Sequence, residues 1–335
     1  MRQKYNSPDD HKFRTALSNL RYKACTDEDI EFLQSRVHTF HPAGPSVCAD
    51  QFRDVSIITG YNSTKDRLNE LGTARWAVEN HQDVYEFFSD DTLSNSNKLP
   101  GKPYRKGYKK SSISSISPKV QDLLWKQPAC STSEKIAGKL SLCKGLPVMI
   151  RYNVATELCI TKGQEGFVYD WITGIGSQGQ QTLKVLFVKL DNPPQTIKFD
   201  GLPENVVPVP SMSTHNICRL PDDSRISLNR KQVPILPNFA MTDYASQGKT
   251  RISNVIDPRH LSIHQSLYTA LSRGVSAEGT LILQGFTNSK LQGGASGALR
   301  QEFRELEGTT ITAFRTWKGL NFIPDNLHPT IQWSK

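Results

Sequence analysis

The chain has 335 residues, of which 41 are Lys or Arg and 32 are Asp or Glu, so its formal net charge is +9. This length accommodates two modest domains, and the basic balance favours an anionic partner such as nucleic acid. The 6 cysteines are widely spaced without a C-x-x-C pair, so neither a zinc site nor a disulfide framework is indicated. No apolar run predicts a membrane span and no leader predicts secretion. We expect an intracellular protein with reduced thiols, nuclear rather than mitochondrial.

Two amphipathic helices are predicted near the start of the chain. Phe13, Leu17 and Leu20 recur at helical spacing and would share one face. The stretch Asp27–Arg36 (DEDIEFLQSR) begins with acidic residues and carries an apolar pair three residues apart, as expected for a second helix.

A buried strand is predicted at Val55–Gly60 (VSIITG), followed by a loop that opens a helix. Asn62, Asp66 and Asn69 come next in the chain. The place where a strand ends and the next helix begins is the usual position of a site in an open α/β sheet, so these residues are candidates for ligand contact. The alternative is N-capping and loop hydrogen bonding, which we favour for Asn69.

A long exposed loop is predicted at Leu93–Pro118, which is rich in Ser, Asn, Gly and Pro. Within it, Lys98–Lys110 contains six cations, two tyrosines and no acidic residue. Cations bind the phosphate backbone and tyrosines stack on unpaired bases, so Lys106 and Lys109 are candidate contacts with nucleic acid. The alternatives are a solvated charged run and a nuclear-localisation patch.

The middle of the chain predicts several short strands, at Val148–Ile150, Phe167–Tyr169, Thr182–Leu190, Thr196–Phe199 and Val206–Val209. Short strands at this spacing, with turn residues between them, predict a small β-barrel-like module. The turn at Lys162-Gly163 either presents backbone N–H groups to a phosphate or is an ordinary hairpin turn. Lys162 is therefore a candidate contact with nucleic acid.

The stretch Met241–Thr250 (MTDYASQGKT) ends like a phosphate-binding P-loop, but the first glycine of that loop would stand where the chain has Asp243. The glycine is needed because backbone N–H groups crowd around the phosphates. The sequence holds no other GK[ST] and no apolar run ending in paired acidic residues, so no Walker A or Walker B motif is visible. We predict a strand at Phe239–Met241, a short helical turn from Thr242, and then Ser246-Gln247-Gly248.

A helix is predicted at Ile263–Ser272, with Gly274 as its C-cap and Thr280–Leu283 as a following buried strand. Arg273 then stands at the helix end, where a long side chain can project toward a neighbouring domain. A guanidinium in that place can bind two phosphate oxygens at once. The alternative is an ordinary arginine that favours the helix dipole.

A last helix is predicted in Gly293–Glu307, where a glycine-rich stretch leads into charged sequence. Leu299, Phe303 and Leu306 would share a face that packs against the rest of its domain. Beyond Phe322, spaced prolines among polar residues predict a loose tail.

Several of these stretches together resemble motifs of superfamily-one helicases of the Pif type. Met241–Thr250 and Ser266–Gly274 (SLYTALSRG), with 15 residues between them, are similar to the last two signature motifs of that family. Arg2-Gln3 resembles its Arg-Gln motif, and Ser141–Val168 resembles a further family block. Gly293–Glu307 is similar to a segment of Pif-like helicases in fungal genomes, including those tied to Helitron transposons. One departure is Tyr244-Ala245, where the family usually has His-Lys.

The resemblance assigns roles to individual residues. Arg273 and Arg2 would be catalytic contacts to the γ-phosphate of ATP, and the nucleotide would also contact Gln247, Gly248 and Tyr268. The contacts with single-stranded DNA that it implies, together with the basic loop, are Thr242, Ser246, Thr250, Asn62, Lys162, Lys106 and Lys109.

The resemblance also implies a fold. We expect an α/β chain with a RecA-like second motor domain of the P-loop-NTPase type and an inserted small SH3-like β-barrel, while the first motor domain with Walker A and B is absent. The expected domains are 1–92 with 233–310 (motor), 93–140 (basic linker or insertion), 141–232 (SH3-like insertion) and 311–335 (tail). ATP and Mg²⁺ would be cofactors only with a first motor domain, supplied by another polypeptide.

Two functions remain open from the sequence. The first is the C-terminal portion of an ATP-dependent DNA helicase that moves 5′ to 3′ on single-stranded DNA, with the family's roles in DNA repair, recombination and telomere maintenance. The second is a catalytically inactive, helicase-derived fragment that binds single-stranded nucleic acid. The missing P-loop favours inactivity of the isolated chain, because half a cleft cannot position the β- and γ-phosphates and Mg²⁺.

Overall fold

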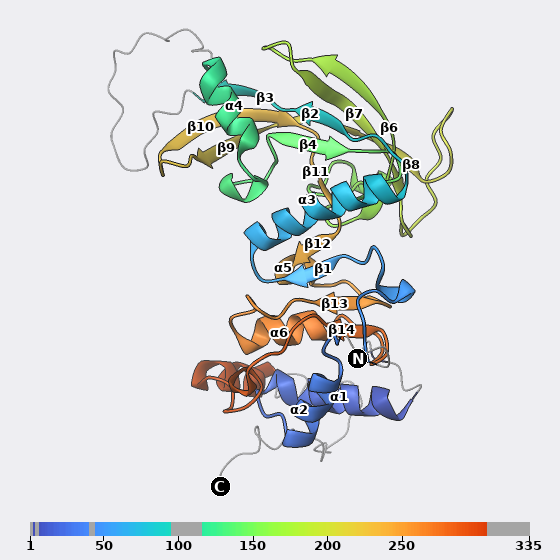
Figure 1. Ribbon diagram of the computed structural model, residues 1–335, viewed down its shortest axis with the longest axis vertical. Helices are drawn as coiled ribbons and strands as arrows, with labels where there is room; N and C mark the ends of the chain where they lie inside the picture. The colour runs from blue at the N-terminus through green and yellow to red at the C-terminus, as the bar shows by residue number, and fades with distance from the viewer. Residues whose placement is uncertain (1–2, 4–6, 40–43, 95–115, 307–335) are drawn as a thin grey trace, which may run out of the picture. The chain divides into compact units, whose positions relative to one another are not determined.

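The computed structural model describes residues 3, 7–39, 44–94 and 116–306 (Figure 1). The chain divides into two compact units, one formed by Met1–Tyr61 with Thr242–Lys335 and the other by Asn62–Met241. We refer to them as unit 1 and unit 2. These boundaries differ from the domain limits expected from the sequence, which stay a prediction. Three of the predicted site residues, Arg2, Lys106 and Lys109, lie outside the described residues.

Unit 1 contains a parallel sheet built from short apolar runs. Strands β1 (Ile57–Thr59), β13 (Asn254–Ile256) and β14 (Thr280–Ile282) pair in parallel. The sheet order is β12-β1-β13-β14, and the unit boundary falls inside β12 (Ala240–Thr242). Every residue of β13 and β14 is buried, as is typical of strands in parallel sheets. A mixed α/β fold with a parallel sheet is thereby confirmed.

Unit 1 also contains helices, and capping residues in the sequence determine where the first two begin. α1 (Pro8–Arg21) begins after Ser7, whose side chain accepts from the backbone N–H of Asp10. α2 (Asp27–Ser35) begins with a capping box between Thr26 and Asp29. The other elements are η1 (Asp50–Phe52), α5 (Asp243–Ser246), α6 (His264–Leu271), η4 (Asn288–Lys290) and a helical stretch at 297–306.

The predicted apolar faces of these helices are confirmed in part. Phe13, Leu17 and Leu20 are all buried on α1. In the 297–306 helix, Phe303 is half-buried and its ring meets that of Tyr22 edge-on, with centroids 5.1 Å apart. Leu306 was expected on the same packed face, but 49% of it is exposed.

Unit 2 is mainly antiparallel β-structure. Its largest sheet has the order β11-β5-β6-β7-β8 and is antiparallel throughout. The strands are β5 (Pro147–Ile150), β6 (Glu165–Ile175), β7 (Gln181–Leu190), β8 (Val206–Pro210) and β11 (Ile235–Pro237). Fully buried side chains between these strands and their neighbours form the largest apolar core of the unit, including Leu142, Leu146, Val148, Leu186 and Val188.

Two smaller sheets complete unit 2. One has the order β3-β10-β9, from β3 (Asp90–Leu93), β10 (Arg225–Gln232) and β9 (Met212–Arg219). The other pairs β2 (Tyr85–Phe88) with β4 (Lys139–Leu142). The remaining elements are α3 (Asn62–Glu79), α4 (Pro118–Lys126), η2 (Ala129–Ser131) and η3 (Thr156–Leu158).

One predicted strand of this unit is wrong. Residues 196–199 form no strand. The backbone N–H of Ile197 donates to the side-chain oxygen of Asn205 at 2.9 Å, and the N–H of Asn205 donates back to the carbonyl of Ile197 at 2.8 Å. These reciprocal bonds close a local loop, so the backbone N–H and carbonyl of Ile197 are not available to a strand ladder.

No helix among the described residues is long and apolar enough to cross a membrane.

Candidate functional site

The guanidinium of Arg273 lies against the end of its own helix. Its Nε donates to the carbonyl of Thr269 at 2.8 Å, and its Nη2 donates to Oγ of Ser272 at 2.7 Å. Only 8% of the residue is exposed. The sequence led us to expect a side chain that projects outward, whereas this conformation satisfies carbonyls that helix ends leave without a partner. A phosphate bound through these same two donors would have to compete with Thr269 and Ser272.

Backbone carbonyls around Arg273 are held by partners from distant parts of unit 1. Nδ2 of Asn254 donates to the carbonyl of Ala270 at 2.9 Å. Nε2 of Gln3 donates to the carbonyl of Gly274 at 2.8 Å and to that of Ser272 at 3.3 Å. The N–H of Arg251 donates to the carbonyl of Arg273 at 2.9 Å. The backbone that carries Arg273 is therefore fixed on both sides of the residue.

The Ser246-Gln247-Gly248 stretch follows a short helix in the same unit. Thr242 caps α5, since its Oγ1 accepts from the N–H of Ala245 at 3.3 Å. Ser246 is fully buried, and its hydroxyl donates to the carbonyl of Asp243 at 2.7 Å. Both hydroxyls thus have structural partners, and contact of Ser246 with nucleic acid requires this turn to open.

The residues just after α5 face solvent. Gln247, Gly248 and Thr250 are exposed. Gly248 has φ of +83°, and a Cβ placed there would meet no atom within 4 Å, so backbone conformation rather than space favours glycine at this position.

The two motifs singled out in the sequence meet in unit 1. Arg251 donates its N–H to the carbonyl of Arg273 at 2.9 Å and accepts from the N–H of Val275 at 3.0 Å. Helices α5 and α6 are also in contact. Tyr268 is half-buried on α6. Gln247, Gly248, Tyr268 and Arg273 are therefore parts of one compact region.

Other predicted contacts lie in unit 2, where two of the three polar residues after β1 are structural. Oδ1 of Asn69 accepts from the N–H groups of Phe239 and Ala240 at 2.9 and 2.8 Å. Asp66 accepts from the N–H of Cys130 at 2.8 Å. Asn69 is thus a buried loop anchor, in line with the interpretation favoured from sequence. Asn62 is half-buried at the start of α3.

Lys162 stands in a turn whose backbone donors are occupied. Its N–H donates to the side-chain oxygen of Asn153 at 2.8 Å, and the N–H of Gly163 donates to the carbonyl of Ile150 at 2.8 Å. The geometry favours ordinary turn chemistry over a phosphate-binding loop. The Lys162 residue itself is exposed, and its predicted role as a cation stays a prediction.

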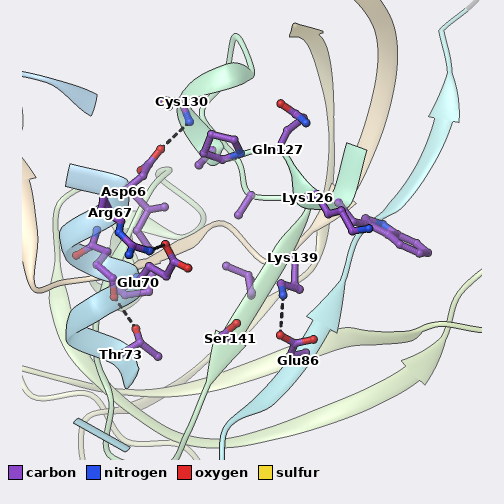
Figure 2. Close-up of a pocket in the computed structure, with 18 of the residues that line it drawn as sticks. Asp66, Arg67, Glu70, Thr73, Glu86, Lys126, Gln127, Cys130, Lys139 and Ser141 are labelled. Atoms are coloured by element: carbon purple, nitrogen blue, oxygen red, sulfur yellow. Dashed lines mark hydrogen bonds and ion pairs between the residues drawn. The ribbon is translucent and has the colours of Figure 1, made fainter. Parts of the chain in front are cut away.

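A cavity of about 670 Å³ lies in unit 2 between α3, the β2–β4 ribbon and the η2 region (Figure 2). Arg67 pairs with Glu70 at 2.7 Å and Lys139 with Glu86 at 2.6 Å, and Figure 2 shows the latter pair on neighbouring strands. The third lining cation, Lys126, lies 2.6 Å from an Asp122 oxygen. Because each of these cations already has a carboxylate partner, the cavity does not favour a phosphate ligand.

Comparison by sequence identifies no relative. No family model matches the chain. No curated protein matches it either.

Comparison of folds finds solved helicase structures. The crystal structure of Pif1 helicase from Candida albicans matches with a TM-score of 0.56 at 20% identity, over 91% of this chain and 59% of that one. Bacteroides Pif1 bound to ssDNA matches with a TM-score of 0.56 at 17% identity, over 92% and 56%. Bacteroides Pif1 in complex with ADP-AlF3 and ssDNA gives 0.55 at 18%, over 92% and 55%. The chain therefore shares the fold of a little over half of a Pif1 helicase.

Proposed function

We propose that the chain is the second-motor-domain portion of an ATP-dependent helicase acting on single-stranded DNA. One observation carries this proposal: the chain just after the first motif is bonded to the end of the second. The backbone of Arg251 forms two hydrogen bonds there, with the carbonyl of Arg273 and the N–H of Val275. The exposed Gln247-Gly248 turn follows α5, which contacts α6, and α6 ends at Leu271, two residues before Arg273. Fold similarity to Pif1 structures that contain ssDNA supports the same function.

The described residues fit one side of an ATP site only. Arg273 offers donors suited to phosphate oxygens. No group of three or more metal-ligating side chains exists among the described residues, and the sequence has Asp243 where a P-loop needs glycine. In this proposal, Mg²⁺ binding and hydrolysis depend on a first motor domain.

We propose the five-stranded sheet of unit 2 as the SH3-like insertion, with the outer side of β6 as a contact surface for unpaired bases. Phe167 and Tyr169 are 39% and 42% exposed. Lys189 lies opposite Phe167 in the β6–β7 register. Exposed rings beside a cation are the features that bind single strands without sequence preference. Sequence reasoning recognised the strand and missed this surface, which only the side-chain alternation could have indicated. A Helitron origin and roles in repair, recombination or telomere maintenance remain predictions of the resemblance.

Two measurements on the purified chain test the function. Fluorescence anisotropy with a labelled single-stranded oligonucleotide and a matched duplex is recorded over a series of salt concentrations. We expect preference for the single strand, with affinity falling as salt rises because counterions are released on binding. Failure to bind the single strand at low salt would contradict the proposal.

ATP hydrolysis with saturating single-stranded DNA is measured alongside. We expect no DNA-stimulated turnover, because the described residues hold one side of the site. Arg273→Ala is compared with Arg300→Ala, which removes the same charge from an exposed helix of unit 1. Turnover lost by about 10³-fold or more in Arg273→Ala alone would show a complete motor and would overturn the split-site assignment. Binding without turnover in all three proteins supports it and leaves a binding role for the isolated chain.

A further inference from the structure

Gln3 reaches across unit 1 to the turn that carries Arg273. The residue is 7% exposed. Its Nε2 donates to the carbonyls of Ser272 and Gly274 at 3.3 and 2.8 Å, and these two residues flank Arg273 in the chain. A glutamine amide has two N–H donors, so one side chain can hold both carbonyls. We propose that Gln3 is a positioning residue for the Arg273 guanidinium.

Gln3 binds two carbonyls of a turn that Asn254 and Arg251 hold at other points. Carbonyls at a helix C-terminus have no partner within the helix, so those of Ser272 and Gly274 need one from elsewhere. A Cβ on Gly274 would come within 2.3 Å of Oγ1 of Thr280, so the backbone fits closely against the start of β14 on that side. The hydrogen bonds from Gln3 to the Ser272 and Gly274 carbonyls are a separate contact that holds this backbone.

The position of this backbone determines where the Arg273 guanidinium lies. Its guanidinium bonds to Thr269 and Ser272, at 2.8 and 2.7 Å, and Ser272 is the residue whose carbonyl Gln3 binds. Loss of the Gln3 donors would leave the carbonyls of Ser272 and Gly274 without this partner, loosen the backbone on either side of Arg273 and weaken both guanidinium bonds. The connection to ATP rests on the proposed function, but the positioning itself does not.

The experiment follows the Nε–Hε signal of Arg273 by NMR in the full chain, assigned by its disappearance in Arg273→Lys. Gln3→Met keeps the side-chain length and removes both donors, whereas Gln3→Lys restores a donor. Gln292→Met is the matched control, since Nε2 of Gln292 donates to the Cys25 carbonyl and to Asp27 at 3.2 and 3.1 Å in the same unit. Thermal unfolding of each variant is recorded in parallel.

We expect hydrogen exchange at Arg273 Nε to quicken by about tenfold or more in Gln3→Met, to return partly in Gln3→Lys, and to stay unchanged in Gln292→Met. Unchanged exchange in a folded Gln3→Met protein would overturn the proposal, as would equal acceleration in Gln292→Met. If Gln3→Met does not fold, Gln3→Lys is the deciding variant. Slow exchange at Arg273 Nε in Gln3→Lys would support the proposal, and fast exchange in a folded Gln3→Lys protein would overturn it. No ATP or DNA enters this readout, so it is independent of a failure of the proposed function.

Discussion

The guanidinium of Arg230 and the carboxylate of Asp91 are joined by two hydrogen bonds, of 3.0 and 2.8 Å, and both side chains are fully inaccessible to solvent. The residues face each other across β10 and β3. Arg230 Nη1 also donates to the carbonyl of Ile136 at 3.0 Å, and Gln121 of α4 donates to Asp91 at 3.1 Å. This buried pair therefore links a sheet, a helix and the segment before β4.

Breaking one side of the pair should destabilise unit 2 strongly. In Asp91→Asn the guanidinium stays buried without a counter-charge, so we expect a loss of about 3–5 kcal/mol in the free energy of unfolding. The double variant Asp91→Leu/Arg230→Met should lose less, because it buries no charge. Urea unfolding measures the free energy of unfolding of both variants.

The exposed pair of Lys139 and Glu86, at 2.6 Å, supplies the control. Glu86→Gln should change the free energy of unfolding by about 1 kcal/mol or less. If Asp91→Asn lowered the free energy of unfolding by no more than Glu86→Gln does, the buried Arg230 pair would stabilise the protein no more than an exposed pair.

Gly72 of α3 lies where the helix touches Phe239. A Cβ there would lie 2.4 Å from Cγ of the Phe239 ring, and Phe239 is itself only 5% exposed. Alanine is the better helix former by about 1 kcal/mol, so propensity alone predicts stabilisation by Gly72→Ala. We expect destabilisation by about 1–3 kcal/mol, because the ring has no free space to move into.

Gly285→Ala is the control for this comparison, since a Cβ at Gly285 would meet nothing within 4 Å. This substitution should change the free energy of unfolding by about 0.5 kcal/mol or less. A higher urea midpoint for Gly72→Ala than for the parent would mean that Phe239 moves aside easily and that the close approach is unimportant.

The sequence predicted the elements whose burial follows a simple period. Phe13, Leu17 and Leu20 are buried on α1 as expected. The extent of α3 to Glu79 could not be predicted, because three of its four buried residues are polar, Lys65, Asn69 and Thr73, and the fourth is the small Ala77. Helical periodicity is detected through apolar residues, so a helix that buries polar side chains leaves no such signal.

The candidate site was predictable at Arg273 and at the Gly248 turn, and much less so in its surroundings. Gln3 and Gly274 are 271 positions apart, and Asn254 precedes two apolar residues in a three-residue strand. No local pattern indicates that these amides hold the Arg273 turn, since the bonds exist only after the sheet has assembled. The inward conformation of Arg273 is different, because its bonds to Thr269 and Ser272 are local, and it corresponds to the alternative of an arginine that stays at its own helix end.

The outer side of β6 should contribute to binding of single-stranded DNA. If Phe167 and Tyr169 stack on bases, removing one ring weakens binding by about 1–3 kcal/mol, and the double variant Phe167→Ala/Tyr169→Ala should weaken it more. Ile175→Ala is the control, because Ile175 is 83% exposed at the end of the same strand and has no ring. Anisotropy over the same series of salt concentrations measures the affinity of each variant for the single strand.

Affinity that is unchanged in the double variant while salt dependence persists would assign binding to cations alone. Equal weakening in Ile175→Ala would indicate a general change in the β6–β7 hairpin rather than stacking.

His264, at the first position of α6, should make stability depend on pH. Burial is the main cause that lowers its pKa below the ordinary 6.5, and the charge of Lys23 acts in the same direction. Its Nε2 is buried with no hydrogen-bond partner in the described part of the chain, so the folded state favours the neutral ring. The unfolded state then binds the proton more readily, and stability present above the unfolded pKa of about 6.5 falls as pH drops through the lowered folded value.

We therefore expect the urea midpoint of the parent chain to fall between pH 7 and pH 5 by more than that of His264→Gln. Glutamine keeps a polar side chain of similar size but takes up no proton in this range. His11→Gln, at an exposed position of α1, is the control and should keep the pH dependence of the parent. If the parent and His264→Gln fell by the same amount, the pH dependence would come from other groups, and protonation of His264 would not oppose folding.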